Sequence, residues 1–305
     1  DVAKELMHYK QHFKDKVVFC NCDDPTYSAF WRYFHLNFHE LGLKKLIATH
    51  YDKTEPTYKM EYDGTYDKDL SLSAQDIDNN INIGIKTPLQ GNGDFRNQEC
   101  IELLKECDIV CTNPPFSLFR EYVAQLITHQ KHFLIIGNCN AMSYKEIFPL
   151  IKDNKIWGGF NGVSNFIQPD GSIKTFGNIM WFTNLEHNKR HEPLILWQHY
   201  YDDQGNPLPD VNIRYPKYDN YDAINVDRVA NIPCDYYGLM GIPNTFTGAI
   251  CPEQFEIIDG IGRYSIMTNE ETKANKKYLS MIDGKAKYFR TIVKLKNKKE
   301  EVSFF

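Results

Sequence analysis

A four-residue turn, Asn113-Pro114-Pro115-Phe116, follows the apolar run from Asp108 to Thr112 and suits chemistry on a planar amino group. The two prolines fix φ and lack N–H donors, so the Asn113 amide and the neighbouring carbonyls stay free as acceptors. An exocyclic NH2 can donate both hydrogens to such acceptors, which leaves its lone pair directed at an electrophile while Phe116 stacks on the attached ring. The pattern predicts an amino methyltransferase, although the same four residues could form an ordinary turn.

The elements around this turn predict the fold. Apolar runs indicate strands at 16–21, 45–52, 108–112, 133–138 and 177–185. Helical spacing of apolar residues indicates helices at 27–41, 99–106, 119–129 and 144–153. The polar stretch 53–90 looks like an insertion with a hairpin-like piece at 58–66, and 288–295 is the clearest late strand. Strands that alternate with helices predict an α/β protein with a doubly wound, Rossmann-like sheet.

Ligands of such sheets bind beyond the carboxyl ends of the strands. Asn21, Asp52, Asp94 and Asn113 all fall there in the predicted order of elements. An acid after the second strand could accept ribose hydroxyls, and Asp94 with Phe95 could bind an adenine amino group and its face. Each acid alone could equally be a cap or turn residue, so only their joint placement with Asn113 predicts a nucleoside pocket.

The chain changes character after Leu185, where a Tyr-, Asn- and Pro-rich stretch with weak periodicity begins. We therefore place a boundary between a catalytic domain at 1–186 and a second region at 187–305. The net charge is −5, yet residues 261–301 hold eleven Lys/Arg against five acids, so this segment is +6 and the rest is −11. A local basic surface suits DNA phosphates, although a solvated lysine-rich face would give the same count.

Length and composition are those of an ordinary globular protein of 305 residues. No apolar stretch approaches the length of a membrane span and no signal peptide opens the chain, so we expect a cytoplasmic protein with no membrane partner. The eight cysteines lack Cys-x-x-Cys spacing and lie mostly in apolar runs, which predicts reduced thiols. Three His-x-x-x-His pairs, at 8/12, 35/39 and 187/191, have no third ligand nearby in the sequence, so no metal is expected.

Seven segments together make the chain similar to the EcoRI-type adenine-specific DNA methyltransferases. These segments are Phe19–Pro25, Gly93–Arg96, Asp108–Ser117, Phe133–Asn138, Met180–Leu185, Gly241–Phe246 and Pro252–Glu256. The likeness covers nearly the whole chain. It implies a site-specific DNA adenine-N6 methyltransferase that uses S-adenosylmethionine, with double-stranded DNA as partner and a possible cognate restriction enzyme.

The resemblance also implies roles for individual residues. The catalytic motif is Asn113, Pro114, Pro115 and Phe116. The cofactor is expected to contact Cys20, Asn21, Cys22, Asp23, Asp24, Pro25, Asp52, Asp94, Phe95 and Asn113. The region 187–305 is expected to recognise the target, with candidate DNA contacts at Lys189, Arg190, Arg214, Lys294, Lys296, Lys298 and Lys299.

Two features depart from the usual pattern. Most methyltransferases have a glycine-rich loop after the first strand, whereas this chain has Asp23-Asp24-Pro25 there. The family also has a short polar-aromatic segment that helps close the cofactor pocket, and the chain starts after it. Two other functions stay open at this point: amino methylation of RNA or a protein glutamine, and DNA or cofactor binding without turnover. A dehydrogenase is disfavoured because no Gly-x-Gly-x-x-Gly follows the first strand.

Overall fold

The computed structural model describes residues 1–52, 56–65, 84–167, 172–262 and 279–296. The chain divides into two compact units, residues 1–139 with 159–187 and residues 140–158 with 188–305. The observed junction at 187/188 lies one residue from the boundary expected from sequence. Residues 140–158 nevertheless belong to the second unit, where the Phe148 and Phe289 rings pack edge to face at 5.7 Å. A single boundary in the sequence cannot represent a segment that leaves one unit and returns to it.

The first unit is built on a mixed sheet. Seven of its strands pair in the order β4-β3-β2-β1-β5-β6-β10. Their bounds are β1 Val17–Cys20, β2 Lys45–Thr49, β3 Tyr58–Tyr62, β4 Ile85–Pro88, β5 Ile109–Thr112, β6 His132–Asn138 and β10 Ile179–Thr183. Strands β2, β1, β5 and β6 are parallel, whereas β3 and β10 run antiparallel to their neighbours. The order reverses between β1 and β5, which is the switch point where α/β sheets bind ligands.

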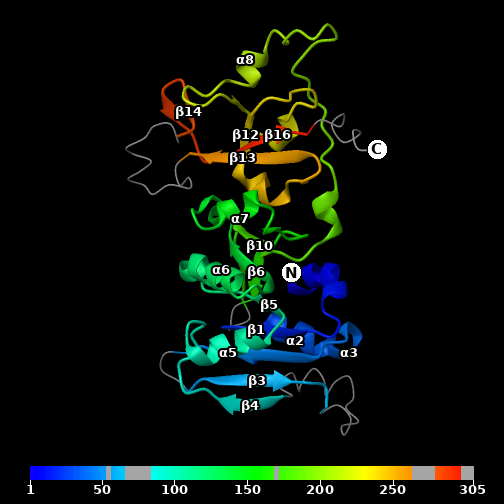
Figure 1. Cartoon of the computed structure of the whole chain (residues 1–305), viewed down its shortest axis with the longest axis vertical. Coiled ribbons are helices and arrows are strands. Elements are labelled where there is room, and N and C mark those ends of the chain that lie inside the picture. The colour runs from blue at the N-terminus through cyan, green and yellow to red at the C-terminus, as the bar shows by residue number, and fades with distance from the viewer. Residues whose placement is uncertain (53–55, 66–83, 168–171, 263–278, 297–305) are drawn as a thin grey trace. The chain divides into compact units, whose positions relative to one another are not determined.

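Helices cover both faces of this sheet, as expected for a doubly wound fold (Figure 1). Their bounds are α1 Val2–Leu6, α2 Ala29–Leu36, α3 Phe38–Leu41, α5 Gln98–Glu106 and α6 Phe119–Thr128, with 3-10 helices η1 Met7–His12 and η3 Phe116–Leu118. Alternate strand residues such as Val18 and Cys20 join one core with Phe30 and Phe34 of α2. On the other face, Phe119 of α6 packs against Phe182 of β10 at 4.9 Å.

The predicted helix at 27–41 is divided in the structure. Helix α2 ends at Leu36, and the short α3 follows after Asn37. Gly42 ends α3 with φ +64, in the left-handed region that favours glycine. The helix predicted at 144–153 is likewise shorter, because only Phe148–Lys152 forms α7, after the 3-10 helix η4 Cys139–Ser143.

The hairpin predicted at 58–66 is wrong. Strand β3 pairs with β2 on one side and with β4 on the other, so the supposed insertion adds two strands to the edge of the sheet. The physical reason is the alternation in β3, whose Tyr58, Met60 and Tyr62 side chains are buried in the core beneath α2 and α3. Residues 66–83, which complete this connection, lie outside the described part of the chain.

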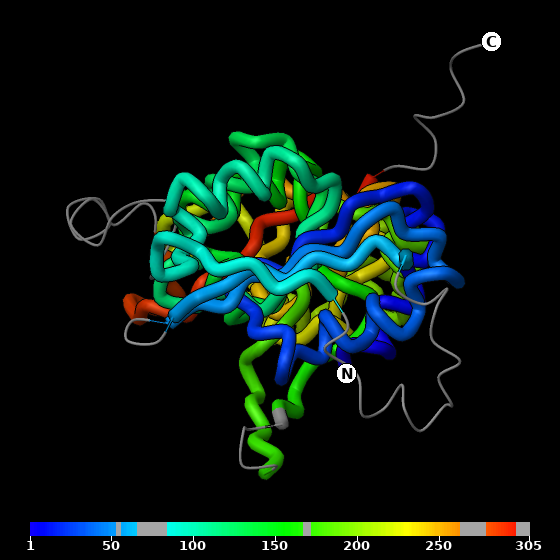
Figure 2. The backbone as a smooth tube through the Cα atoms, turned by 90° about the horizontal axis from the view of Figure 1, so that it is seen from below, coloured from blue at the N-terminus to red at the C-terminus, as the bar shows by residue number. Residues whose placement is uncertain are grey.

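A small hairpin also belongs to the first unit. Strands β8 Asn165–Ile167 and β9 Ile173–Thr175 pair with each other and project from the sheet in Figure 2. Its base is tied to the start of the chain, because Asp1 Oδ2 accepts hydrogen bonds from the backbone N–H groups of Ser164 and Asn165 at 3.2 and 3.0 Å.

The second unit contains a four-stranded sheet in the order β11-β12-β16-β13. The strands of this sheet are β11 Ile224–Asn225, β12 Met240–Pro243, β13 Phe255–Ile261 and β16 Arg290–Leu295. The unit also contains the paired strands β14 Met281–Ile282 and β15 Lys285–Ala286, and the short strand β7 Trp157–Gly158. Its helices besides α7 and η4 are α8 Val211–Arg214, η5 Asn188–His191, η6 Val229–Asn231 and η7 Asn244–Ala249. The strand predicted at 288–295 is confirmed as β16. Tyrosines such as Tyr200 and Tyr215 fill the core where the periodicity was weak.

Candidate active site and nucleic-acid surface

Asn21 connects the carboxyl ends of three neighbouring parallel strands. Its side-chain Oδ1 accepts a hydrogen bond from Thr49 Oγ1, at the end of β2, at 2.9 Å. Its backbone carbonyl accepts one from Thr112 Oγ1, at the end of β5, at 2.5 Å. Only 1% of Asn21 is exposed, and its Nδ2 has no hydrogen-bond partner among the described residues. A buried amide donor left unused is what a bound acceptor group would satisfy.

The turn after β1 is rigid and ends in a helix cap. The Asp23 backbone N–H donates to the carbonyl of Thr49 at 3.1 Å. Asp23 Oδ2 accepts from Ser28 Oγ at 2.5 Å, and Ser28 Oγ in turn accepts from the Trp31 backbone N–H, which caps α2. Burial raises the pKa of the Asp23 carboxyl to about 7, although the Ser28 hydrogen bond acts in the opposite direction. This carboxyl therefore changes charge near neutral pH.

Asp24 is held by the second and third strands of the sheet. Its Oδ1 accepts hydrogen bonds from the Tyr58 hydroxyl and from Thr26 Oγ1, both at 2.8 Å. His50 Nε2 lies 3.7 Å from Asp24 Oδ2, and the His50 and Tyr58 rings stack with centroids 5.1 Å apart. Asp24 thus fixes the turn, and its carboxylate is already used by the protein.

The loop 91–95 is pressed against the end of β2. Gly93 has φ +73, and a Cβ at this position would lie 2.1 Å from the His50 carbonyl oxygen, so only glycine fits. The same loop reaches the first turn, with Cys22 Sγ 4.0 Å from the Gly93 carbonyl. The Asp52 backbone N–H donates to the carbonyl of Asn92 at 3.2 Å. The structure therefore brings together the Cys22 turn, Asp52 and the Asp94 loop, as the sequence predicted.

Asp94 and Phe95 differ in how they are held. Arg96 forms two hydrogen bonds to the Asp94 carboxylate, at 2.8 and 2.7 Å, and lowers its pKa. Phe95 is 1% exposed and packs edge to face on Tyr122 of α6 at 4.9 Å, while Gln125 Nε2 donates to the Phe95 carbonyl. Asp94 is an ionised acceptor, but the ring of Phe95 belongs to the core, so its contact with an adenine stays a prediction.

The turn that carries the predicted catalytic residues begins one residue beyond β5. Asn113 is exposed and Pro114 is buried, and neither forms a hydrogen bond to another described residue. The Pro115 carbonyl accepts from the Leu118 backbone N–H at 3.0 Å, which starts η3 and turns the chain into α6. Phe116 remains 40% exposed. The acceptors and the aromatic ring are thus available at the switch point between β1 and β5.

Three further predicted cofactor contacts differ in exposure. Cys20 is fully buried in the core beneath α2, so only its backbone could reach a ligand. Pro25 is also buried, at the start of the chain segment that leads to α2. Cys22, by contrast, is partly exposed in the turn, with φ +57. Burial raises the pKa of the Cys22 thiol to about 12.

Several residues that support the site were missed in the sequence. These are Ser28, Thr49, His50, Tyr58 and Arg96. Ser28 stands directly before a run of apolar residues with helical spacing, which is the usual signal of an N-cap. Thr49, His50 and Tyr58 give no local signal, because each acts on a residue that the fold brings to it. Arg96 lies only two residues from its partner Asp94, so its pairing could have been considered from the sequence.

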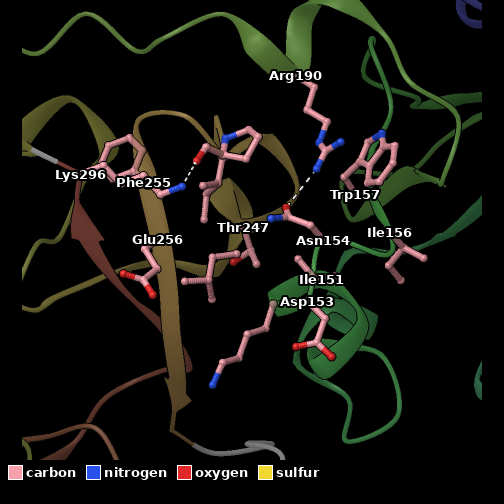
Figure 3. A pocket seen from close by; sticks show the side chains of 14 residues that line it. Ile151, Asp153, Asn154, Ile156, Trp157, Arg190, Thr247, Phe255, Glu256 and Lys296 are labelled. Atoms are coloured by element: carbon pink, nitrogen blue, oxygen red, sulfur yellow. Dashed lines mark hydrogen bonds between the residues drawn. The ribbon is translucent and has the colours of Figure 1, made fainter. Parts of the chain in front are cut away.

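The predicted DNA contacts that the structure describes lie in the second unit. Arg190 stacks on Trp157 at 3.6 Å and donates to Asn154 Oδ1 at 3.0 Å (Figure 3). Lys296 Nζ donates to the Pro252 carbonyl at 2.6 Å. Both cations line one pocket of about 280 Å3, and none of the pocket's lining residues belongs to the predicted catalytic site.

The remaining predicted DNA contacts are dispersed. Lys189 is exposed on η5, and Lys294 is exposed on β16, opposite Glu256 of β13. Arg214 is paired with Asp210, with Nε 2.9 Å from Oδ2. Lys298 and Lys299 lie outside the described residues, as does the basic stretch 263–278. In the described part of the chain, no helix is long and apolar enough to cross a membrane.

Comparisons with known proteins show the family to which the chain belongs. The model of the family "Adenine-specific methyltransferase EcoRI" matches residues 1–296. The type II methyltransferase M.EcoRI of Escherichia coli is 42% identical, over 97% of this chain and 91% of the relative. M.MpnI of Mycoplasma pneumoniae and M.MgeORF184P of Mycoplasma genitalium are 37% and 35% identical, each over 96% of this chain and 92% of the relative. No solved structure shows a significant match.

Proposed function

The chain belongs to the EcoRI family of adenine-specific methyltransferases, and we propose that it methylates the N6 amino group of an adenine in double-stranded DNA with S-adenosylmethionine as methyl donor. The observation that carries the proposal is the free Asn113-Pro114 turn beside an exposed Phe116 at the switch point of the sheet. The relatives are type II methyltransferases, which supports DNA over RNA or protein glutamine as the substrate.

The turn at residues 113–116 contributes to catalysis by positioning the target adenine. A target base inside a duplex cannot reach a protein turn, so we infer that the adenine is flipped out of the helix before reaction. Asn113 Oδ1 and the Pro114 carbonyl then accept its two amino hydrogens, and Phe116 stacks on its ring. The same two oxygens stabilise the positive charge that develops on N6 in the transition state, until a proton leaves to water.

The carboxyl-end residues fit a nucleoside cofactor. The Cys22 turn, the Gly93 loop and Asp52 converge at the carboxyl end of β2, and Asn21 Nδ2 is a buried donor without a partner among the described residues. We propose that Asp52 accepts the ribose hydroxyls and that the ionised Asp94 accepts the adenine amino group. The Asn21–Asp24 turn would hold the methionine end of the cofactor. When bound, S-adenosylmethionine supplies the electrophilic methyl group.

The second unit is proposed to recognise and bind the DNA. Arg190 and Lys296 are held in fixed positions around one pocket, so they can meet phosphates without ordering new side chains. Loops between His187 and Thr247 are the proposed base-reading segments. The type II relatives further suggest that methylation protects the same DNA sequence from a cognate endonuclease.

The decisive experiment incubates the purified protein with labelled S-adenosylmethionine and duplex DNA, then digests the DNA to nucleosides. We expect label in N6-methyl-2′-deoxyadenosine from the DNA alone, with structured RNA and unfolded protein as competing acceptors in parallel reactions. Label in RNA or in glutamine, with none in DNA, would contradict the proposed substrate. Binding of the cofactor without transfer to any acceptor would instead support a protein that has kept the fold without turnover.

A further inference from the structure

Three side chains of different chemistry converge in the second unit, whereas the proposed methyl-transfer residues belong to the first unit. They are His199, Cys234 and Asp235, and their ligand atoms all lie within 4.8 Å of one another. His199 Nδ1 is 3.2 Å from Asp235 Oδ2 and 3.6 Å from Cys234 Sγ. An imidazole, a thiol and a carboxylate are the three side chains that bind zinc in proteins.

The separations match the edges of a zinc tetrahedron. With Zn–N and Zn–O bonds of about 2.05 Å and a Zn–S bond of about 2.3 Å, tetrahedral angles place N and O about 3.3 Å apart and N and S about 3.6 Å apart. The observed 3.2 and 3.6 Å agree with both values. Two of the three edges therefore already have the separation of a bound site, and the third, between Cys234 Sγ and a carboxylate oxygen of Asp235, lies within 4.8 Å.

Backbone contacts hold the three ligands in place. The Cys234 backbone N–H donates to the Gln198 carbonyl at 2.8 Å, and Gln198 also forms a parallel β-bridge with Pro233. Asp235 Oδ1 accepts from the Tyr200 backbone N–H at 2.7 Å, which directs its other oxygen to His199. Ligands that are themselves fixed by surrounding hydrogen bonds are characteristic of built metal sites.

The geometry argues against a catalytic cysteine. In a nucleophilic Cys–His pair the thiol and the orienting carboxylate contact different ring nitrogens. Here the nearest approach of both groups is to Nδ1, since Cys234 Sγ lies farther from Nε2, at 3.9 Å. When the thiol and the carboxylate both lie nearest to the same ring nitrogen, all three donor atoms can bind one metal ion.

A second cluster in the same unit, formed by Cys251, Glu253 and His191, contains the same kinds of side chain in a different arrangement. Cys251 Sγ donates to Glu253 Oε2 at 3.2 Å, while His191 Nδ1 contacts the other oxygen, Oε1, at 2.8 Å. The carboxylate thus separates the thiol from the imidazole. Within the described chain, the ligand atoms of these three residues do not all come within 4.8 Å of one another. It supplies a matched control.

We propose that His199, Cys234 and Asp235 bind one zinc ion that fastens the segment around 198–201 to the segment around 233–236. The His199 side chain is 63% exposed, so water or an added ligand can complete the fourth position. The ion would also brace Arg214, whose Nη2 lies 3.5 Å from the His199 carbonyl and whose charge is offset by Asp210. The ion has a structural role, and the methyl transfer proposed above does not pass through it.

Metal content of the full chain tests the proposal. Tag-free protein is stripped with a chelator, dialysed against limiting zinc, and analysed for bound metal. We expect one equivalent in the wild type, and a loss of at least tenfold in affinity in Cys234→Ser and in His199→Gln. The controls Cys139→Ser and His191→Gln, which remove a half-buried thiol and a carboxylate-paired histidine elsewhere, should bind zinc as the wild type does.

Cobalt reports the ligands directly. Addition of Co2+ to the stripped protein should produce a thiolate-to-cobalt charge-transfer band, which Cys234→Ser abolishes and Cys139→Ser retains. Because His199 is exposed, its substitution should leave the melting temperature of the metal-free protein unchanged, which separates loss of the site from loss of the fold. Wild-type protein without bound zinc, or a cobalt band that persists in Cys234→Ser, would overturn the proposal.

Discussion

Asn113 and Phe116, the proposed catalytic residues, are exposed at the end of β5. Asn113 forms no hydrogen bond to another described residue, so its side chain serves neither β5 nor α6. Asn113→Ala should therefore leave the fold and cofactor affinity nearly unchanged while lowering kcat by about 10²–10³, the usual loss for one transition-state hydrogen bond. Single-turnover methyl transfer with calorimetric measurement of cofactor binding checks both parts. Equal turnover by the folded variant would remove Asn113 from catalysis.

The Phe116 ring should contribute less. We expect Phe116→Ala to cost about 1–3 kcal/mol in kcat/KM for DNA, which is the usual effect of a stacking side chain on one base. Phe116→Tyr, which keeps an aromatic face at this 40% exposed position, should retain most of the activity. Similar losses in both variants would show that the ring packs in the protein instead of on the base.

Asp23 predicts a pH dependence of cofactor binding. Its folded pKa is about 7, raised by burial, so its carboxylate becomes charged as the pH rises through neutrality. An ionised Asp23 attracts a cationic cofactor, so affinity for S-adenosylmethionine should increase between about pH 6 and 8. Asp23→Asn should flatten this dependence and bind most weakly, relative to wild type, at the alkaline end. Calorimetric titrations at several pH values measure it; parallel curves for the two proteins would contradict it.

Ionisation of Asp23 should have the opposite effect on folding stability from its effect on cofactor affinity. Between the unfolded value near 3.8 and about 7, the folded chain keeps a proton on Asp23 that the unfolded chain has released. The contribution of this group to stability therefore falls as the pH rises through that window. Asp23→Asn should reduce the fall, which thermal melting at pH 5 and about pH 8 can follow.

At the level of elements, Glu5 ties the first helix to a distant loop of the same unit. Its fully buried carboxyl group accepts from the Tyr9 hydroxyl at 2.8 Å and from the backbone N–H groups of Phe160 and Asn161 at 2.6 and 2.7 Å. Glu5→Gln turns one acceptor into a donor that faces another donor. We expect a loss of about 2–4 kcal/mol in the free energy of unfolding.

Urea unfolding followed by circular dichroism measures this loss. Glu40→Gln is the matched control, because Glu40 is an exposed partner of Lys10 whose removal should cost about 0–1 kcal/mol. If the two variants unfold at the same urea concentration, the buried network does not anchor α1 to residues 160–161.

The elements that sequence predicts well are those whose signal is local. Strands β1, β5 and β6 are continuous apolar runs, and the acceptor turn at Asn113 is fixed by its own prolines. The position of β3 in the sheet has no such local signal. It is set by pairing with β2, which places Leu46 opposite Tyr62, and the turn that follows β3 does not determine this pairing. The contacts of Thr49 with Asn21 and of Tyr58 with Asp24 likewise join residues that are distant in the sequence, so only the folded chain defines them.

At the scale of the whole molecule, charge decides how an acidic protein can approach DNA. A net charge of −5 repels phosphates on average, so binding requires a local cationic surface. The proposed surface includes Lys294 and Lys296, followed in the chain by Lys298 and Lys299. Lys294 extends from β16, and Lys296 is anchored on the Pro252 carbonyl.

Neutralising Lys294, Lys296, Lys298 and Lys299 together should weaken binding to every DNA sequence alike. The slope of log K against log salt should fall by up to about 0.9 for each phosphate that is no longer neutralised, because fewer counterions are released. The choice of methylation site should not change, since phosphate contacts position a protein whereas base contacts specify the sequence. Binding isotherms at several salt concentrations, for cognate and random duplexes, give both quantities. A fourfold substitution of Lys10, Lys45, Lys59 and Lys105, which all pair with acids in the first unit, controls for the change in net charge. An equal reduction of the slope in the control would mean that overall charge is responsible, and an unchanged slope in the first fourfold variant would move the DNA surface toward Lys189, Arg190 and Arg214.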